Sequence, residues 1–253
     1  MTAIRPVPPI AHRGLHDESR GIIENTASAF RAAIAGRYAI ETDIQAAAGG
    51  EPVIFHDATL DRLTAAEGPL SAHTAAALAK IPMRGTSDRI MTLEAFLALV
   101  GGRVPLFLEI KALGGSDRTL ERRVAEALAD YHGPVSVISF DPGSLIAIRE
   151  AAPEIPRGLT AMRYFKHPKN GLDEVSRFRL THMLDVDAVK PDFLTYEVND
   201  LAVMGPALRR RFPGLPILTW TVRTREDRRK AERFADGIIF EGFTPSSRER
   251  ADQ

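Results

Sequence analysis

Two histidines and three carboxylates occupy positions at which a folded chain could bring them together for chemistry. His12 and His56 each follow a short apolar stretch, and Glu41, Asp43 and Glu109 lie within or directly after two others. Histidine can give or take a proton near neutral pH, and converging carboxylate oxygens are the ligands that Mg²⁺ or Ca²⁺ prefer. These residue types are therefore typical of proton transfer beside a divalent metal ion.

The spacing of the carboxylates supports a metal site. Alternate residues of an extended strand point to the same face, so Glu41 lies beside Asp43, and Glu109 beside Lys111. Carboxylates buried together repel one another unless a cation neutralises them. A single acid could instead pair with an arginine or cap a turn, but this explanation does not account for the recurrence on several strands. The pattern therefore favours a divalent cation.

Composition excludes several other classes of function. Of 253 residues, 33 are Lys or Arg and 33 are Asp or Glu, so the net charge is zero and no global field attracts nucleic acid. We therefore expect no nucleic-acid partner. The chain has no cysteine, which excludes disulfides, thiolate metal ligands and a cysteine nucleophile.

The hydropathy pattern predicts a protein without stable membrane insertion. The N-terminal residues lack the apolar core of a signal peptide, and no apolar run approaches the roughly 18 residues of a transmembrane helix. We therefore expect a cytoplasmic location. The sequence does not define an oligomeric state.

Predicted strands and helices alternate along the whole chain. The predicted strands, after a first one that ends before His12, are 39–44, 52–55, 104–110, 135–140, 158–161, 188–191, 217–222 and 237–240. The predicted helices are 27–35 with Asn25 or Thr26 as its cap, one from Thr92 to Val100, and 120–131, 144–152, 175–180, 202–212 and 225–234. About eight strand and helix pairs in a chain of this length favour a closed (β/α)₈ TIM barrel over an open sheet.

The barrel prediction also fixes where the chemistry should occur. Catalytic groups of such barrels lie at the carboxyl ends of the strands, where we expect His12, Glu41, Asp43, Glu109 and Lys111. The segment of about residues 57–91 interrupts the alternation and is interpreted as a small insertion after the second strand. With no linker or repeat elsewhere, residues 1–253 are interpreted as one domain.

An ordered set of short motifs runs over nearly the whole chain. The segments are 11–14 (Ala-His-Arg-Gly), 24–26 (Glu-Asn-Thr) with Ala29 and Phe30, 41–43 (Glu-Thr-Asp), 52–57 (Pro-Val-Ile-Phe-His-Asp) with Leu60, Arg62 and Thr64, 105–111 (Pro-Leu-Phe-Leu-Glu-Ile-Lys), 139–141 (Ser-Phe-Asp), 219–222 (Thr-Trp-Thr-Val) and 236–239 (Asp-Gly-Ile-Ile). Each tripeptide is weak by itself, but the ordered set is highly specific, and it resembles the glycerophosphodiester phosphodiesterase family.

The resemblance implies a TIM barrel that uses a divalent metal to cleave glycerophosphodiesters to glycerol 3-phosphate and an alcohol. Transferred to this chain, it makes His12 and His56 the acid/base pair. The metal ligands implied are Glu41, Asp43 and Glu109, with Mg²⁺ or Ca²⁺ as the cofactor. Arg13 and Lys111 would contact the phosphate, and Trp220 could stack on a substrate carbon face or simply pack at the barrel mouth.

Two departures from the family pattern lie near the expected mouth of the barrel. Arg223 follows Trp-Thr-Val where the family often has Asn, and residues 240–243 (Phe-Glu-Gly-Phe) replace its usual Thr-Asp. Both leave the histidines and the carboxylates intact. We therefore expect them to affect the choice of leaving alcohol more than the class of reaction.

Several alternatives stay open at this level. A lysophospholipase D or sphingomyelinase D-like activity on the same barrel would need an exposed apolar rim, for which Phe165, Phe193, Phe240 and Phe243 are candidates. A phosphate-binding barrel without turnover would have lost a histidine or a carboxylate, and none is missing. The sequence assigns neither histidine as the base, and the attacking hydroxyl could come from water or from the substrate glycerol.

Overall fold

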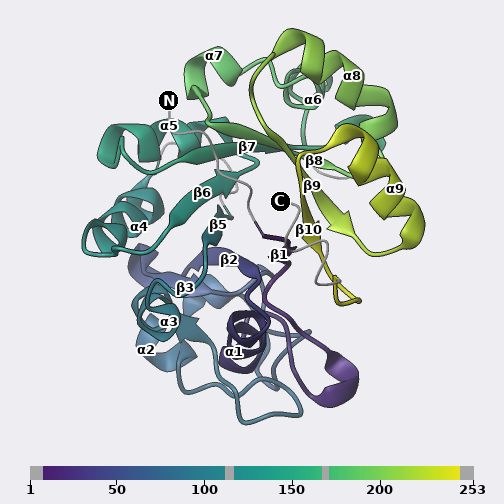
Figure 1. The fold of residues 1–253 in the computed structure, drawn as a ribbon. Coiled ribbons are helices and arrows are strands. Elements are labelled where there is room, and N and C mark those ends of the chain that lie inside the picture. Colours follow the sequence, from purple (N-terminus) through teal and green to yellow (C-terminus); the bar gives the residue numbers. More distant parts are fainter. Residues whose placement is uncertain (1–7, 112–116, 167–170, 246–253) are drawn as a thin grey trace.

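Eight parallel strands close into a barrel in the computed structural model, which describes residues 8–111, 117–166 and 171–245. The barrel closes where β1 pairs with both β2 and β10, so the two ends of the chain contribute neighbouring strands (Figure 1). The barrel strands are β1 (Ile10–Ala11), β2 (Ala39–Ala46), β5 (Leu106–Ile110), β6 (Val135–Ser139), β7 (Arg157–Ala161), β8 (Phe193–Glu197), β9 (Ile217–Val222) and β10 (Gly237–Phe240). The predicted TIM barrel is confirmed.

Helices surround the strands and bury their apolar faces against them (Figure 1). The helices are α1 (Ala27–Ala35), α2 (Ala75–Leu78), α3 (Leu93–Val100), α4 (Thr119–Ala129), α5 (Pro142–Ala151), α6 (Glu174–Thr181), α7 (Val186–Val189), α8 (Leu201–Arg211) and α9 (Arg225–Phe234). Thr26, rather than Asn25, caps α1 by accepting from the Ala29 N–H. This leaves the Asn25 side chain free to bond elsewhere.

One predicted strand was wrong. Residues 188–191 were expected to be extended, but Val189 N–H donates to the Asp185 carbonyl and closes a turn of helix α7. Lys190 then adopts a left-handed conformation with φ of 50°, which ends the helix, and β8 begins three residues later at Phe193. The short Ala-Val pair was compatible with either structure, and local helical hydrogen bonds decided it.

The barrel interior is built in layers, with an apolar floor. This floor comprises Ile10, Ala39, Phe107, Ile138, Phe193, Leu218 and Ile239, one residue from each of seven strands. Because strand side chains alternate, the residue two positions after each floor residue also points inward. The layer above the floor therefore contains His12, Glu41, Glu109, Trp220 and Glu241. An apolar base supports a layer of chemically active side chains at the carboxyl ends of the strands.

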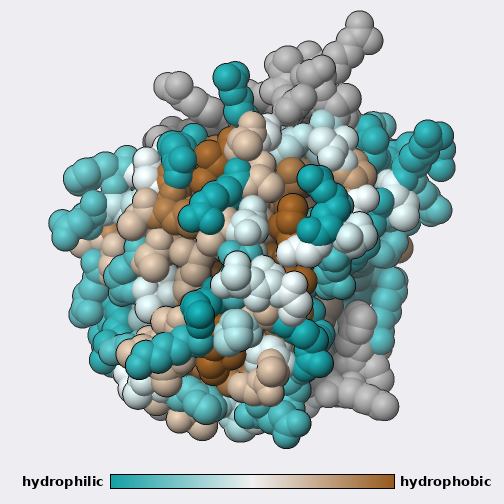
Figure 2. All heavy atoms as spheres, turned by 90° about the horizontal axis from the view of Figure 1, so that it is seen from below, coloured by the Kyte–Doolittle hydropathy of each residue, from teal (hydrophilic) through white to brown (hydrophobic). Residues whose placement is uncertain are grey.

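The segment between β2 and α3 has a small hydrophobic core of its own. Strands β3 (Pro52–Ile54) and β4 (Met91–Thr92) extend the sheet from β2 in antiparallel fashion. The core residues are Ala47, Val53, Phe55, Leu60, Leu63, Leu70, Ala75, Leu78, Met83 and Ile90. Figure 2 shows the face seen from below Figure 1, where hydrophobic residues form separate small groups among hydrophilic ones. The small core of the segment between β2 and α3 holds the backbone after β3, and with it His56, against the barrel.

None of the helices in the described ranges is both long enough and apolar enough to cross a bilayer.

Candidate active site

Three buried carboxylates lie at the centre of the site. Glu41 and Asp43 project from β2, and Glu109 projects from β5, where it is the register partner of Asp43. One oxygen of each lies within 4.8 Å of the others, and the three residues are at most 8% exposed. Burial and the neighbouring carboxylates raise the pKa of Glu41 well above its ordinary value, and raise that of Glu109. The fold therefore concentrates negative charge in a place that water screens poorly.

Two cations compensate part of this charge. Lys111 Nζ lies 3.0 Å from Asp43 Oδ1 and 2.7 Å from Glu109 Oε1, and Arg13 Nε lies 3.2 Å from Asp43 Oδ2. Burial alone would raise the pKa of Asp43, but Lys111 and Arg13 lower it well below the usual range of a carboxyl. Burial would likewise lower the pKa of Lys111, and Glu109 with Asp43 raises it instead. Asp43 is therefore the most firmly ionised of the three acids.

The turn after β1 places Arg13 in a conformation that few side chains adopt. Its φ is 55°, and its backbone N–H donates to Glu41 Oε2 at 3.0 Å. Gly14 follows with φ of 79°, and a Cβ there would lie 2.9 Å from the Ala29 side chain. Only glycine fits this close approach to α1. The Arg-Gly pair thus gives the β1 to α1 turn the shape that directs both the backbone and the side chain of Arg13 to the carboxylates.

Asn25 contacts a central carboxylate, although in the sequence it stood out only as a possible helix cap and as part of the 24–26 (Glu-Asn-Thr) motif. It donates through Nδ2 to Asp43 Oδ2 at 2.9 Å and accepts from the Thr42 hydroxyl at 2.7 Å. It is 1% exposed and has φ of 57°, a conformation that Asn tolerates better than most residues. Its place in the 24–26 (Glu-Asn-Thr) motif was the signal that could have found this contact. Asn25 fixes the orientation of the Asp43 carboxylate.

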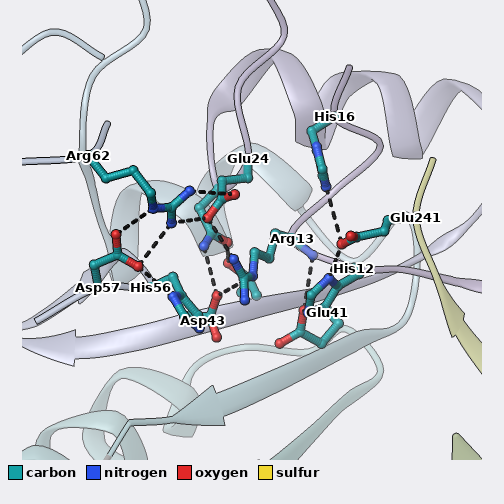
Figure 3. A network of polar contacts seen from close by, with 12 residues as sticks. His12, Arg13, His16, Glu24, Glu41, Asp43, His56, Asp57, Arg62 and Glu241 are labelled. Atoms are coloured by element: carbon teal, nitrogen blue, oxygen red, sulfur yellow. Dashed lines mark hydrogen bonds and ion pairs between the residues drawn. The ribbon is translucent and has the colours of Figure 1, made fainter. Parts of the chain in front are cut away.

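His56 lies on one side of the carboxylates within a chain of ion pairs (Figure 3). Its Nδ1 is 2.6 Å from Asp57 Oδ1. Arg62 contacts Asp57 at 2.6 and 2.9 Å and also donates to Glu24 at 2.8 and 3.1 Å. The hydrogen bond from Arg62 lowers the pKa of Asp57 to about 2, despite partial burial. Asp57 therefore stays ionised and accepts a hydrogen bond from Nδ1–H of His56.

His12 lies on the opposite side and has its own carboxylate (Figure 3). Its Nδ1 is 2.5 Å from Glu241 Oε2, in the layer above the barrel floor, and its Nε2 is 3.9 Å from Glu41 Oε2. Burial lowers the pKa of His12, although Glu241 opposes this effect. Arg223 donates to the other Glu241 oxygen at 2.5 Å, and His16 Nε2 lies 3.7 Å from Oε2. Both histidines thus carry a carboxylate on Nδ1.

Trp220 stands in the same layer, on β9. Its ring contacts Phe140 edge to face, with centroids 5.3 Å apart, and its Nε1 has no hydrogen-bond partner among the described residues. The ring is partly buried. Trp220 therefore presents an apolar surface beside the polar groups and an unused donor at its edge.

The residues present fit a divalent cation. Glu24, Glu41, Asp43, Asp57 and Glu109 supply five carboxylates. Arg13, Arg62 and Lys111 supply three cations, so two negative charges remain when both histidines are neutral. In addition, Glu41 Oε1 is buried without a hydrogen-bond partner. Hard carboxylate oxygens, an excess of two negative charges and an orphaned acceptor are what Mg²⁺ or Ca²⁺ would satisfy.

The structure places all eight predicted site residues on or directly after five strands, β1, β2, β3, β5 and β9. These residues are His12, Arg13, Glu41, Asp43, His56, Glu109, Lys111 and Trp220. Glu241 and Arg223 stood out in the sequence as departures from the family pattern, but their link to His12 was not predicted. The alternation on β10, in which Ile239 is followed two residues later by Glu241, was the signal that could have found the first of them. The pairing of β1 with β10 then supplies the proximity.

Comparison with known proteins identifies relatives of the whole chain. The model of the glycerophosphoryl diester phosphodiesterase family matches residues 12–242. A glycerophosphodiester phosphodiesterase of Caldanaerobacter subterraneus subsp. tengcongensis is 27% identical over 241 residues, covering 91% of this chain and 92% of that protein. Glycerophosphodiester phosphodiesterase 1 of Mus musculus is 24% identical over 247 residues, covering 88% and 73%.

Solved structures share the fold over a similar length. A phosphodiesterase of Oleispira antarctica, in complex with the product sn-glycerol-3-phosphate, has a TM-score of 0.78 at 21% identity and covers 98% of both chains. A glycerophosphodiester phosphodiesterase of Thermotoga maritima has a TM-score of 0.69 at 25% identity, covering 93% of this chain and 95% of that one. Because the family model spans both histidines, all three central carboxylates and Glu241, this chain belongs to the glycerophosphoryl diester phosphodiesterase family of enzymes.

Proposed function

We propose that this protein hydrolyses glycerophosphodiesters to glycerol 3-phosphate and an alcohol, with dependence on Mg²⁺ or Ca²⁺ and with His12 and His56 as the acid/base pair. The observation that carries the proposal is the position of two histidines, each bonded to a carboxylate, on opposite sides of a buried carboxylate cluster. Family membership supports the same class of reaction.

Glu41, Asp43 and Glu109 would hold the cation. When bound, the cation would supply positive charge to a phosphodiester oxygen and lower the pKa of a hydroxyl beside it. The carboxylates would then have a counter-charge that Arg13 and Lys111 do not fully provide. The proposed ligand set rests on the excess of negative charge and on the orphaned Glu41 oxygen.

Arg13 and Lys111 would bind the phosphate of the substrate. They reach the carboxylate cluster from the carboxyl ends of β1 and β5, the two strands that flank β2, and both are less than one-fifth exposed. A phosphodiester anion repels an attacking oxygen, so cations that spread its charge lower the barrier. Trp220 would cover the carbon skeleton of glycerol or of the alcohol, for which its partly buried ring offers an apolar face.

His12 and His56 would divide the two proton transfers. In the reaction an oxygen attacks phosphorus and loses a proton to one imidazole, and the bond from phosphorus to the alcohol oxygen breaks. The departing alkoxide takes its proton from Nε2 of the other imidazole, which enters the step protonated on both nitrogens and leaves it neutral. Each ring donates a hydrogen bond from Nδ1–H to a carboxylate, so Nε2 is the nitrogen left to face the substrate.

The segment of residues 57–91 would act as an insertion that supports His56. Arg62 from this segment links Asp57 to Glu24, which also binds Arg13. The small core beneath it holds Leu60 and Leu63 on either side of Arg62. We propose that the insertion serves the site by fixing the Asp57 carboxylate.

The first test is release of glycerol 3-phosphate from glycerophosphocholine and glycerophosphoethanolamine. The protein is treated with EDTA, and Mg²⁺ or Ca²⁺ is then restored. We expect release only with a metal, because the carboxylate cluster cannot be neutralised otherwise. Release that EDTA leaves intact would contradict the metal site, and no release with any metal would contradict the proposed activity.

A lysophosphatidylcholine arm tests the lysophospholipase D alternative. Phe193 and Phe240 are buried and cannot form an apolar rim, but Phe165 is 45% and Phe178 is 50% exposed on the segment after β7. Those two exposed rings are the observation that favours this alternative. Lysophosphatidic acid formed faster than glycerol 3-phosphate would move the assignment to lysolipids.

A further inference from the structure

Glu241 and Arg223 form an ion pair beside His12. Glu241 follows β10 and Arg223 follows β9, and the Arg223 Nε donates to Glu241 Oε1 at 2.5 Å. The second carboxylate oxygen, Oε2, lies 2.5 Å from His12 Nδ1. One carboxylate thus connects an outer arginine with a histidine of the proposed acid/base pair. Figure 3 shows the contact of Glu241 with His12.

This contact fixes the tautomer of His12. Burial alone would raise the pKa of Glu241, but its contacts with His12, His16 and Arg223 lower it below the ordinary range of a carboxyl. An ionised carboxylate can only accept, so the proton of the contact lies on Nδ1. A neutral His12 therefore has its lone pair on Nε2, the nitrogen that lies 3.9 Å from Glu41. Without Glu241 both tautomers and other ring rotations would compete.

Arg223 fixes the carboxylate in turn. The glutamate side chain has three rotatable bonds, and its backbone position beyond β10 does not by itself direct the carboxylate to His12. The Arg223 backbone N–H is bonded to Asp227 in the capping box of α9, which holds the start of the arginine in place. The guanidinium then binds the oxygen that His12 does not use. The two departures from the family pattern, Arg223 and Glu241, therefore form one ion pair that contacts His12.

A cavity reaches this carboxylate from outside the barrel. Its volume is about 500 Å³, and it is lined by residues of the β1 to α1 segment and of the segment after β10. The lining includes Leu15, His16, Arg20, Arg223, Glu241 and Phe243. His12 is not part of the lining, so Glu241 separates the cavity from the histidine. A small solute could enter from this side if the glutamate side chain were shortened.

Given the proposed phosphodiesterase activity, we infer that Glu241, held by Arg223, is the positioning residue that directs Nε2 of His12 toward the reacting groups. The pair acts through His12 and does not bind substrate. It sets the turnover number rather than the affinity for substrate or metal.

The first experiment replaces the carboxylate while keeping its shape. We expect Glu241→Gln to lower kcat for glycerophosphocholine on the order of 10²-fold, because one proton transfer loses its orientation. The KM and the affinity for Mg²⁺ measured by calorimetry should stay within about twofold, a limit below 0.5 kcal/mol. Glu241→Asp, which restores the charge, should recover part of the rate. Arg209→Ala, which removes the exposed ion pair of Arg209 with Asp236, is the matched control and should leave kcat unchanged.

The cavity permits a chemical rescue. We expect formate or acetate to raise the kcat of Glu241→Ala, because either anion can enter the space left by the side chain and accept from His12. Formamide, which is neutral and of similar size, should not act, and the wild type should not respond to formate. Rescue by the anion alone supports a positioning carboxylate, and a purely structural role predicts no rescue.

A readout independent of turnover separates this inference from the proposed activity. The Nδ1 proton of His12, bonded to a carboxylate, should give a downfield imidazole resonance that His12→Ala identifies by its loss. The inference requires that Glu241→Gln shift or abolish this resonance, even if no diester were cleaved. A wild-type kcat in Glu241→Gln, an unchanged resonance, or equal responses to formate and formamide would each overturn it. Inactivity of the wild type with the resonance effect intact would overturn only the proposed activity.

Discussion

The two histidine groups have the same local chemistry but are built differently. On the His56 side, Asp57 is the next residue in the chain and Arg62 follows five positions later, so one short segment provides histidine, carboxylate and arginine. On the His12 side, Glu241 comes from 229 positions away and Arg223 from another strand end. The Arg62 side chain is 45% exposed and also reaches the buried Glu24. The Arg223 side chain is 54% exposed, and within the described residues its ion pair is the one with Glu241.

This difference separates local from global requirements. The His56 group needs only the turn after β3 and its small core, so a short motif contains it. The His12 group exists only when β1 and β10 pair and the barrel closes. The proposed acid/base pair therefore joins a segment that can be specified locally with one that reports closure of the whole fold.

The largest expected effect tests whether both groups take part in chemistry. We predict that His12→Ala and His56→Ala each lower kcat for glycerophosphocholine by roughly 10²- to 10⁴-fold, since each removes one proton-transfer group. Steady-state rates measure this, with thermal unfolding to show that both variants stay folded. A rate close to that of the wild type in one variant would remove that half from the mechanism.

The carboxylate on the His56 side should matter as much as its counterpart. We predict that Asp57→Asn lowers kcat about 10²-fold with little change in KM, because an amide does not stabilise the same tautomer or a charged imidazole. Steady-state kinetics measure both constants. Glu51→Gln, at an exposed position whose ion pair within the described residues is with Arg123 at 3.8 Å, serves as the matched control. A loss of kcat far smaller than that of Glu241→Gln would show that Asp57 shapes the turn after β3 and does not orient His56.

The sequence predicted most of the barrel and the central groups because both follow local rules. Alternating strands and helices, and the i, i+2 spacing of Glu41 with Asp43, can be recognised in short windows. The contact of Glu241 with His12 cannot be recognised in a short window, because it depends on closure of the barrel by β1 and β10. The strand at residues 188–191 was wrong for a related reason: a window of four residues does not include the helical bond from Val189 to Asp185.

The shared centre can be tested through metal binding alone. We predict that Glu41→Gln weakens binding of Mg²⁺ or Ca²⁺ at least about tenfold, because it replaces one of the three converging carboxylates by a neutral amide with a single oxygen. Calorimetric titration of the metal-free protein measures it, and Glu241→Gln is the comparison that should bind normally. Equal affinities in Glu41→Gln and the wild type would show that the cation, if any, lies elsewhere.

The two arginines should differ in their effect on stability. Arg62→Ala leaves the carboxylates of Asp57 and Glu24 without one of their donors, and Glu24 is only 6% exposed. We predict a loss of roughly 1–3 kcal/mol in the free energy of unfolding. Arg223→Ala removes an exposed partner and should cost less than about 1 kcal/mol. Urea unfolding measures both, and equal losses would mean that the local group is no better connected than the global one.

The pH dependence of stability gives the smallest effect and isolates Asp57. Its pKa in the folded protein is about 2, below the ordinary value of 3.8, so the folded state favours the ionised form. The stabilisation is complete above about pH 5 and is lost as the pH falls toward 2, because the unfolded chain takes up the proton first. We therefore predict that the difference in unfolding free energy between the wild type and Asp57→Asn narrows between about pH 6 and pH 3. A difference that stays constant over this range would show that the ion pair with Arg62 does not hold the Asp57 carboxylate in solution.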